Sequence, residues 1–512
     1  LIEDLQQTSW WHEDWPAAVI AAAPERFDRA CDRWRELYQA ALDDQAEQNR
    51  IVLDGSVRKQ ARTAAEGRRR EAEGQLRLLR NEDTDRTHSD FYTYRYFASE
   101  GFLPGYSFPR LPLAAYIPGV RATLGNRAGG DYLQRPRFLA ISEFGPGAII
   151  YHEGARYEIK RIQVPMNSGG IGTVDTQDAY RCESCGYHHV RRAGLDVCEN
   201  CGAALGVPQY GLMRMQTVFA RRRERISSDE EERRRAGFEL HTSYRFSEHG
   251  PRLGRSDAAV RDDQGGLITV SYGDTATVRV TNVGRRRRKH PADLGYWLDT
   301  VKGNWLSERD AEDTTPQDES LDDAADIPTK QKVIPYVEDT RNILVVRLDT
   351  PVAQEVSTSL RYALERGIEA QFQLEDSELS SEALPDNDGR GRMLFTESAE
   401  GGAGVLRRLH TEPDALARVA TAALEIMHFG PDGTDLGNAE GARERCEKAC
   451  YDCLLSYGNQ TDHAVINRHA IRDLVFRLAA ATTVPATADE PRGDRAAQLK
   501  AQCESDLQRD FI

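Results

Sequence analysis

The spacing of four cysteines constrains this chain more than any other feature of its sequence. Cys182 and Cys185 are separated by two residues, and after twelve more residues Cys198 and Cys201 repeat the spacing. Two such pairs place four thiolates around one zinc ion, and a glycine follows each pair, where the backbone must turn tightly. We therefore predict a closed, structural zinc ribbon rather than four unrelated thiols.

A second cysteine cluster lies near the end of the chain. Cys446, Cys450 and Cys453 fall within eight residues, and three thiolates call for one further ligand. His463 is the nearest candidate for the fourth position, while His469 or a residue from elsewhere in the chain remains open. The cluster predicts a second zinc ion.

The composition excludes several classes of protein. The 512 residues carry 67 basic and 82 acidic side chains, a net charge of −15, so the molecule is not a polycation and nucleic-acid binding needs local basic patches. No run approaches the ~18 apolar residues of a membrane span, so we expect no membrane contact. With nine cysteines, seven of them clustered, we expect metal binding in a reducing compartment, the cytoplasm, and not a disulfide scaffold.

The order of the expected elements predicts an α+β protein of roughly three domains. Apolar residues repeat at three and four positions near the start, and short alternating runs follow them. The segments expected are a helical hairpin (1–90), a small β-rich domain (91–306) with the zinc ribbon inserted at 180–204, an acidic linker (307–331), a C-terminal α/β domain with the Cys-rich zinc module (332–480), and the start of a truncated further domain (481–512).

Within the β-rich domain one local signal predicts a β-hairpin. Residues 267–272 and 276–282 alternate between apolar and polar side chains, and the turn-forming pair Gly273-Asp274 separates them. We therefore expect two antiparallel strands joined by a tight turn.

Two groups of arginines could contact nucleic-acid phosphates. Arg191 and Arg192 lie between the two knuckles of the ribbon, beside His188 and His189, and a basic run, Arg285, Arg286, Arg287 and Arg288, follows an expected strand. A solvated basic loop is the alternative explanation for both groups.

No catalytic residue is predicted. The chain has no Walker A sequence, nucleophile elbow or protease-type histidine pair, so no ATPase or nuclease motif is present. The run Gly401–Gly404 lacks the Lys-Ser/Thr of a P-loop, and we expect it to allow tight packing between a strand and a helix rather than phosphate binding.

Two stretches near the end of the chain resemble a known domain. Residues 400–406 (EGGAGVL) and 450–460 (CYDCLLSYGNQ) are similar to the MZB domain, a zinc-binding domain of unknown function on the C-terminal side of certain superfamily 2 helicases. Residues 98–106 (ASEGFLPGY) and 227–233 (SSDEEER) resemble the region that joins helicase cores to it. The resemblance covers roughly residues 90–480 and is nearest to anti-phage helicases of the DISARM and Druantia type, with DNA-repair helicases further off.

This resemblance implies a function that the residues alone do not. It implies the C-terminal part of an ATP-dependent DNA translocase, with zinc cysteines at Cys446, Cys450 and Cys453 and with ATP bound only by helicase lobes before Leu1. The chain begins at Leu1 and ends inside an apolar repeat, so we expect a fragment, and residues 506–511 resemble the start of a further, nuclease-like domain. The alternatives are a free-standing zinc scaffold that binds a partner protein in a defence complex, and a metal hydrolase with an open zinc site at the second cluster.

Overall fold

The computed structural model confirms a mixed α+β protein that begins with helices. It describes residues 13–80, 93–100, 102–103, 112–118, 131–164, 174–191, 194–223, 237–249, 252–300, 302–312, 330–375, 378–398, 402–439 and 445–486. Two compact units result: one comprises Leu1–Leu253, Thr275–Arg341 and Ala399–Gly402, and the other Gly254–Asp274, Asn342–Ser398 and Ala403–Ile512.

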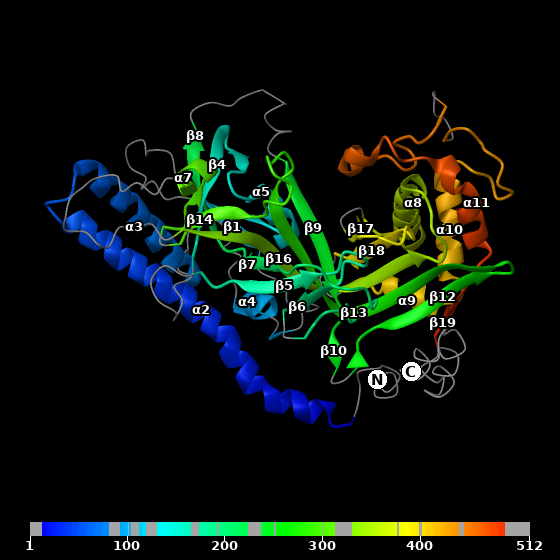
Figure 1. Ribbon diagram of the computed structural model, residues 1–512, viewed down its shortest axis with the longest axis horizontal. Helices are drawn as coiled ribbons and strands as arrows, with labels where there is room; N and C mark the ends of the chain where they lie inside the picture. Colours follow the sequence, from blue (N-terminus) through cyan, green and yellow to red (C-terminus); the bar gives the residue numbers. More distant parts are fainter. Residues whose placement is uncertain are drawn as a thin grey trace. The chain divides into compact units, whose positions relative to one another are not determined.

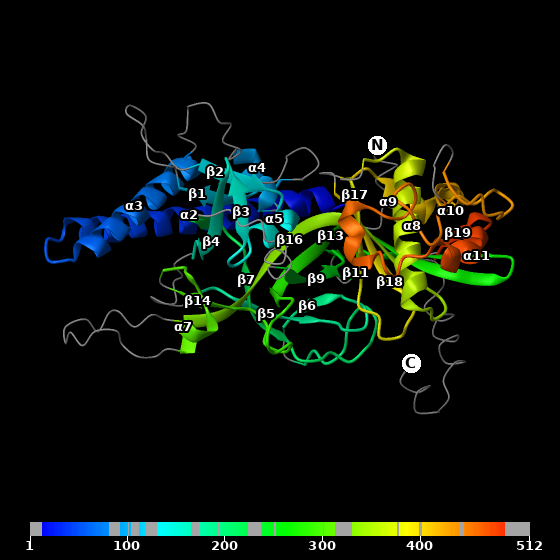
Figure 2. The same cartoon turned by 90° about the horizontal axis from the view of Figure 1, so that it is seen from above.

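The first unit opens with two long helices that lie side by side, α2 (Trp15–Leu53) and α3 (Lys59–Arg80) (Figures 1 and 2). Small side chains, among them Ala41 and Ala72, are buried where the helices meet, which allows their backbones to approach closely. The indole of Trp34 donates a hydrogen bond across the pair to the carbonyl of Leu79 (3.2 Å). Residues 54–58 connect the two helices.

A five-stranded sheet follows. Its strands are β1 (Leu113–Ile117), β2 (Asp131–Arg135), β3 (Ile149–His152), β4 (Ala155–Ile162) and β8 (Val218–Arg223), in the order β2-β1-β8-β4-β3. Helix α5 (Arg137–Glu143) packs on one face, where Ile141 and Phe144 join Ile159 of β4 in a hydrophobic core. Alternate residues of these strands therefore point either into this core or to the opposite face.

The ribbon cysteines lie among the remaining strands of the first unit. The elements are α4 (Thr93–Ser99), β5 (Gln177–Arg181), β6 (His188–Val190), β7 (Gln209–Arg214), β9 (Phe238–Arg245), β10 (Glu248–His249), β11 (Arg252–Leu253), β14 (Tyr296–Asp299), β15 (Trp305–Leu306) and α7 (Glu308–Glu312). β5 pairs with β6 and β7, and β7 runs parallel to the first part of β16 (Lys330–Leu348).

The predicted hairpin at Gly273-Asp274 is wrong. The structure has one long strand, β13 (Gly265–Arg285), through this point. Its first part pairs with β12 (Ser256–Asp262) and its second part with β9, so each part has its own partner. The turn-forming residues produce only a local irregularity, a positive φ of 50° at Thr275, because pairing along both parts outweighs the local preference.

The second unit packs helices on a sheet around one large core. Its elements are β12, the first part of β13, the end of β16, α8 (Gln354–Phe372), β17 (Leu379–Ala383), β18 (Arg392–Glu397), α9 (Val405–Thr411), α10 (Ala415–Ile426), η1 (Tyr457–Asp462), α11 (Arg468–Ala479) and β19 (Thr482–Pro485). Helix α10 contacts both α8 and α11, and the core includes Cys446 and Cys453. The second cysteine cluster is therefore built into this core.

The glycine before α9 has a conformational role, because a Cβ at Gly404 would meet nothing within 4 Å and close strand–helix packing does not require glycine there. The buried carboxylate of Glu397, at the end of β18, accepts a hydrogen bond from the backbone N–H of Leu406 in the first turn of α9 (2.9 Å). Gly404 caps this helix with a φ of +73°. The N-terminus of α9 thus already has an internal anion, which disfavours an external phosphate there.

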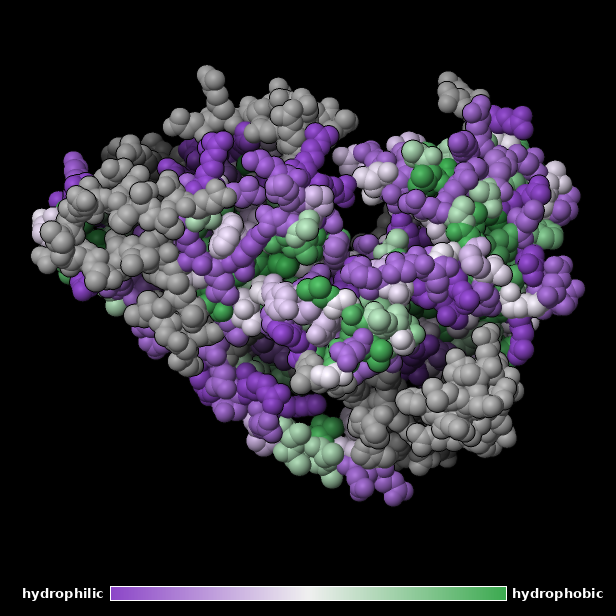
Figure 3. All heavy atoms as spheres, viewed as in Figure 1, coloured by the Kyte–Doolittle hydropathy of each residue, from purple (hydrophilic) through white to green (hydrophobic). Residues whose placement is uncertain are grey.

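Hydrophilic residues make up most of the visible coloured surface, and hydrophobic ones show as separate patches (Figure 3). None of the described helices is long and apolar enough to cross a membrane.

Several sequence predictions fall outside the described residues. They concern Arg192, Gly401, residues 227–233, most of the acidic linker (313–329) and residues 506–511.

Two helical glycines provide a test of the packing. A Cβ at Gly367 in α8 would lie 2.6 Å from the carbonyl oxygen of Val419 in α10, whereas a Cβ at Gly67 in α3 meets nothing within 4 Å. We expect Gly367→Ala to lower the free energy of unfolding by about 1–3 kcal/mol through overpacking. Gly67→Ala should raise it by about 0.5–1 kcal/mol through helix propensity. Urea unfolding measures both, and an unchanged Gly367→Ala variant would contradict the close approach of α8 and α10.

Candidate metal centres

The first cysteine group is formed by two turns with the same backbone pattern. In each turn, the carbonyl of the first cysteine accepts a hydrogen bond from the glycine after the second: Gly186 N–H to Cys182 (2.9 Å) and Gly202 N–H to Cys198 (2.8 Å). Both glycines have a φ near +75°, which favours glycine over any residue with a Cβ. The turns direct both thiols of each pair to the same side.

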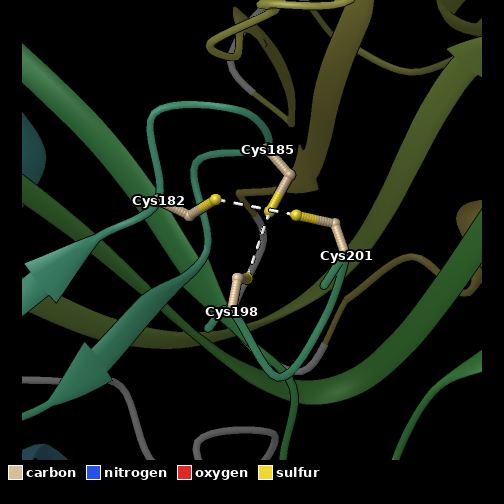
Figure 4. Close-up of side chains that lie close together, drawn as sticks. All are labelled: Cys182, Cys185, Cys198 and Cys201. Carbon is tan, nitrogen blue, oxygen red and sulfur yellow. Dashed lines mark hydrogen bonds between the residues drawn. The ribbon is translucent and has the colours of Figure 1, made fainter. Parts of the chain in front are cut away.

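The four sulfurs converge on one point (Figure 4). The Sγ atoms of Cys182 and Cys201 lie 3.6 Å apart, and those of Cys185 and Cys198 lie 3.7 Å apart. A tetrahedral zinc ion with Zn–S bonds of about 2.3 Å requires sulfurs about 3.7 Å apart. The residues present therefore fit zinc.

Neighbouring side chains contact these sulfurs through nitrogen atoms. The Nε2 atom of His189 lies 3.3 Å from the Sγ atom of Cys198, and its Nδ1 atom lies 3.2 Å from Glu199. Asn200 donates to Cys185 from the opposite turn. A protonated Nε2 would stabilise the thiolate charge. Burial lowers the pKa of His189. His188 and His189, which precede the predicted phosphate-binding Arg191 in sequence, are both buried.

The second group has a histidine that the sequence analysis missed. Cys446, Cys450, Cys453 and His428 place one ligand atom each within 4.8 Å of one another. The Nε2 atom of His428 lies 3.2 Å from the Sγ atom of Cys450, and the Sγ atom of Cys453 lies 3.5 Å from Cys450 and 3.8 Å from Cys446. Three sulfurs and one imidazole at these distances also suit a tetrahedral zinc ion.

A helix end directs His428 toward the thiols. Helix α10 ends in a Schellman motif, in which the N–H of Phe429 bonds to Leu424 (2.9 Å) and the N–H of His428 bonds to Glu425 (3.0 Å). His428 occupies the left-handed position of this motif, with a φ of +62°, where glycine is usual. A histidine at the end of a predicted helix, where glycine is usual, could have indicated this ligand from the sequence. Its side chain reaches the cysteine cluster, which a glycine could not do.

A buried arginine holds the segments that carry two of the four ligands. The side chain of Arg468 is 0% exposed, and its guanidinium donates to the carbonyls of Met427 (3.0 Å) and Cys446 (2.8 Å). It also forms a bidentate ion pair with Asp435, which lowers the pKa of that carboxyl. Arg468 therefore connects the backbone before His428 to the backbone of Cys446.

The charge states of the second group suit a metal centre. Burial, helped by the positive charge of Arg468, lowers the pKa of His428, which favours the neutral imidazole that a metal needs. Burial raises the pKa of the Cys453 thiol to about 12, so a metal ion has to displace its proton.

The predicted fourth ligand, His463, does not join this group. Its Nε2 atom lies 2.9 Å from Oδ1 of Asn459 and 3.1 Å from the carbonyl of Ser456, near η1. The other candidate, His469, lies against the carbonyl of Glu447 (2.8 Å). The structure replaces both with His428, because the end of α10 packs next to the cysteines although it lies upstream in sequence.

The predicted arginines divide into structural and exposed residues. Arg285 donates to the carbonyl of Pro146 (3.1 Å), and Arg288 pairs with Glu239 (2.6 Å). Arg286 and Arg287 are exposed. Separately, the half-exposed Arg191 pairs with Asp178 (2.8 Å) and lies over the ring of Tyr210.

The second group lies in a segment that matches a known domain. Residues 360–454 match the family described as MZB, the MrfA Zn-binding domain, and all four ligand candidates fall within them. The chain therefore carries an MZB domain, as the sequence resemblance predicts, and its two cysteine-rich groups support zinc as the cofactor.

Comparison with solved structures finds one described as "Crystal Structure of DUF1998 helicase MrfA bound to DNA". The identity is 9% and the TM-score 0.31, over 71% of this chain and 34% of that chain. The chain thus spans about a third of the length of that helicase. No curated protein matches the chain.

A pair of histidine variants tests the ligand assignment. The intact chain should bind about two zinc ions, and His428→Ala should retain about one, because three thiolates remain at the second centre without their fourth ligand. His463→Ala is the matched control and should keep both ions. Native mass spectrometry counts the metal. Loss of zinc from the His463→Ala variant with retention in His428→Ala would reverse the assignment.

The ribbon should contribute directly to folding. Cys182→Ser should lower the thermal midpoint and release one zinc ion, because the binding energy of a structural zinc ion is folding energy. Cys31→Ser, outside both groups, is the control and should change neither. Calorimetry together with a chromophoric zinc chelator measures the two effects. Equal midpoints for the Cys182→Ser variant and the intact chain would refute the ribbon.

Proposed function

We propose that this chain is the zinc-containing, nucleic-acid-guiding accessory part of an ATP-dependent DNA helicase or translocase. The observation that carries the proposal is the MZB match over residues 360–454, which contains the whole second metal centre. The domain is named after MrfA, and the solved MrfA structure is that of a helicase bound to DNA. ATP would be bound by helicase lobes outside these residues, and the assembly would act in the cytoplasm in phage defence or DNA repair.

The zinc ions would brace the fold in this proposal. Each centre has four protein ligand candidates, which leaves no position for a substrate or an activated water. This composition favours structural zinc over the metal hydrolase considered from the three cysteines alone. The first centre would hold the β5-β6 region of the first unit, and the second would hold the end of α10 to residues 446–453.

Guidance of a DNA strand requires local positive charge, since the chain as a whole carries −15. Arg286 and Arg287 are exposed after β13, with one nitrogen of Arg286 donating to the carbonyl of Phe238 (3.1 Å), whereas Arg285 and Arg288 are partly buried against protein atoms. Among the four predicted arginines of this run, the two exposed ones are therefore the candidates for phosphate contacts.

The proposal predicts salt-dependent binding of single-stranded DNA. Affinity should fall as salt rises, and Arg286→Ala/Arg287→Ala should reduce the slope of log K against log salt by about 1.4, at ~0.7 per phosphate contact. The loss should be similar for all sequences, because backbone contacts carry no base information. Fluorescence anisotropy at several salt concentrations measures the slope.

Two outcomes would contradict this proposal at different levels. If the intact chain does not bind single-stranded DNA at low salt, the guiding role fails and a scaffold that binds a partner protein is favoured. If the chain binds but the double variant behaves identically, only the assignment of this arginine run fails.

A further inference from the structure

One face of the five-stranded sheet carries a row of charged and aromatic side chains that no motif predicted. In register across three strands, Tyr151 of β3 lies opposite Arg156 of β4, which lies opposite Arg223 of β8. In the row two residues away, Glu158 of β4 lies opposite Arg221 of β8. These side chains share a face, because side chains alternate along a strand and Tyr157, between Arg156 and Glu158, is buried in the core on the other side. Arg222, which lies opposite Tyr157, is exposed at the end of β8.

The same face is covered by the helices at its other end. There Tyr132, Tyr116 and Phe219 form a row of rings on β2, β1 and β8. The guanidinium of Arg161 lies over Phe219 and pairs with Glu71 of α3. A Cβ on Gly74 of α3 would lie only 3.4 Å from the hydroxyl of Tyr132, which shows how closely this helix covers the sheet.

The other end of the face remains exposed and positive. Tyr151 is 45% exposed, the side chain of Arg223 is 55% exposed, and Arg221 is also exposed. The patch, which we call the β4–β8 patch, consists of Tyr151, Arg156, Glu158, Lys160, Arg221 and Arg223. It holds four cations and one carboxylate, and Glu158 is shared between Lys160 (2.6 Å) and Arg223.

The register sets two cations against each other. Arg156 and Arg223 stand directly opposite each other, and like charges in this arrangement destabilise a sheet. Within the patch, Glu158 pairs with Arg223. A bound anion placed over this row would lower the repulsion between the two arginines.

We propose that the β4–β8 patch binds single-stranded nucleic acid, with a base stacked on Tyr151 and phosphates held by Arg221 and Arg223. The inference rests on the proposed function and adds a binding surface to it. Arg221 and Arg223 lie two residues apart on β8, which separates them by about 6.6 Å along the strand. The exposed ring of Tyr151 provides the stacking platform that sequence-tolerant single-strand binding uses.

The ring also distinguishes nucleic acid from an acidic protein. Unpaired bases stack on aromatic side chains, whereas an acidic peptide needs only the cations. Bases within a duplex are already stacked on one another, so the ring favours a single strand.

The experiment measures binding of a labelled oligo(dT) strand to the full chain by fluorescence anisotropy. Arg221→Ala/Arg223→Ala should weaken binding about tenfold at 0.15 M salt and lower the salt slope by about 1.4. Tyr151→Ala should weaken binding about fivefold or more, and Tyr151→Phe, which keeps the ring, should restore it. The matched control is Arg26→Ala/Arg29→Ala on exposed positions of α2, which removes the same charge and should leave affinity within about twofold.

The outcomes separate this inference from the proposed function. No binding by the intact chain overturns the proposed function and the patch together. Binding by the intact chain with unchanged affinity in the Arg221→Ala/Arg223→Ala variant overturns the patch alone. A Tyr151→Ala variant that binds normally, with polyglutamate competing as well as oligo(dT), assigns the patch to an acidic protein and also overturns the inference. If the double variant melts earlier than the intact chain, the single Arg221→Ala variant decides, with an expected loss of about fourfold.

Discussion

The convergence of four ligand atoms on one point is the constraint on which both metal centres depend. Four ligand atoms lie within 4.8 Å of one another in each centre, and this closeness requires tight turns of the backbone that carries them. In the first centre two glycines with positive φ provide this reversal, and in the second the Schellman end of α10 provides it through His428. A zinc ion bound by these ligands would add its binding energy to the folding of the turns that hold them.

The two centres differ in what surrounds them. The first relies on local turns and has one exposed cysteine, Cys201. The second is part of a large core and is supported by the ion pair between the buried Arg468 and the partly buried Asp435. Removing Asp435 would leave the buried charge of Arg468 without this partner, which is destabilising, so the second centre depends on residues that are not themselves ligands.

The positive charge of the chain is concentrated at particular sites. A chain with a net charge of −15 can attract a nucleic-acid backbone only where cations gather without equal numbers of acids. Many of its arginines are committed to protein contacts, as Arg285, Arg288 and Arg161 are. Those left exposed on a strand face, such as Arg221, are therefore more informative than the length of a basic run.

Sequence alone determined the features whose cause is local. The Cys-x-x-Cys spacing and the following glycines indicated the ribbon, helical periodicity indicated α2 and α3, and the motifs near residues 400 and 450 indicated the MZB domain. Tertiary structure decided what depends on distant partners. The packing of α10 places His428 next to Cys450. Strand β13 continues through Gly273-Asp274 because each part of the strand pairs with its own partner. Tertiary structure also aligned Tyr151, Arg156 and Arg223 into one row, since strand register joins residues that no sequence period relates.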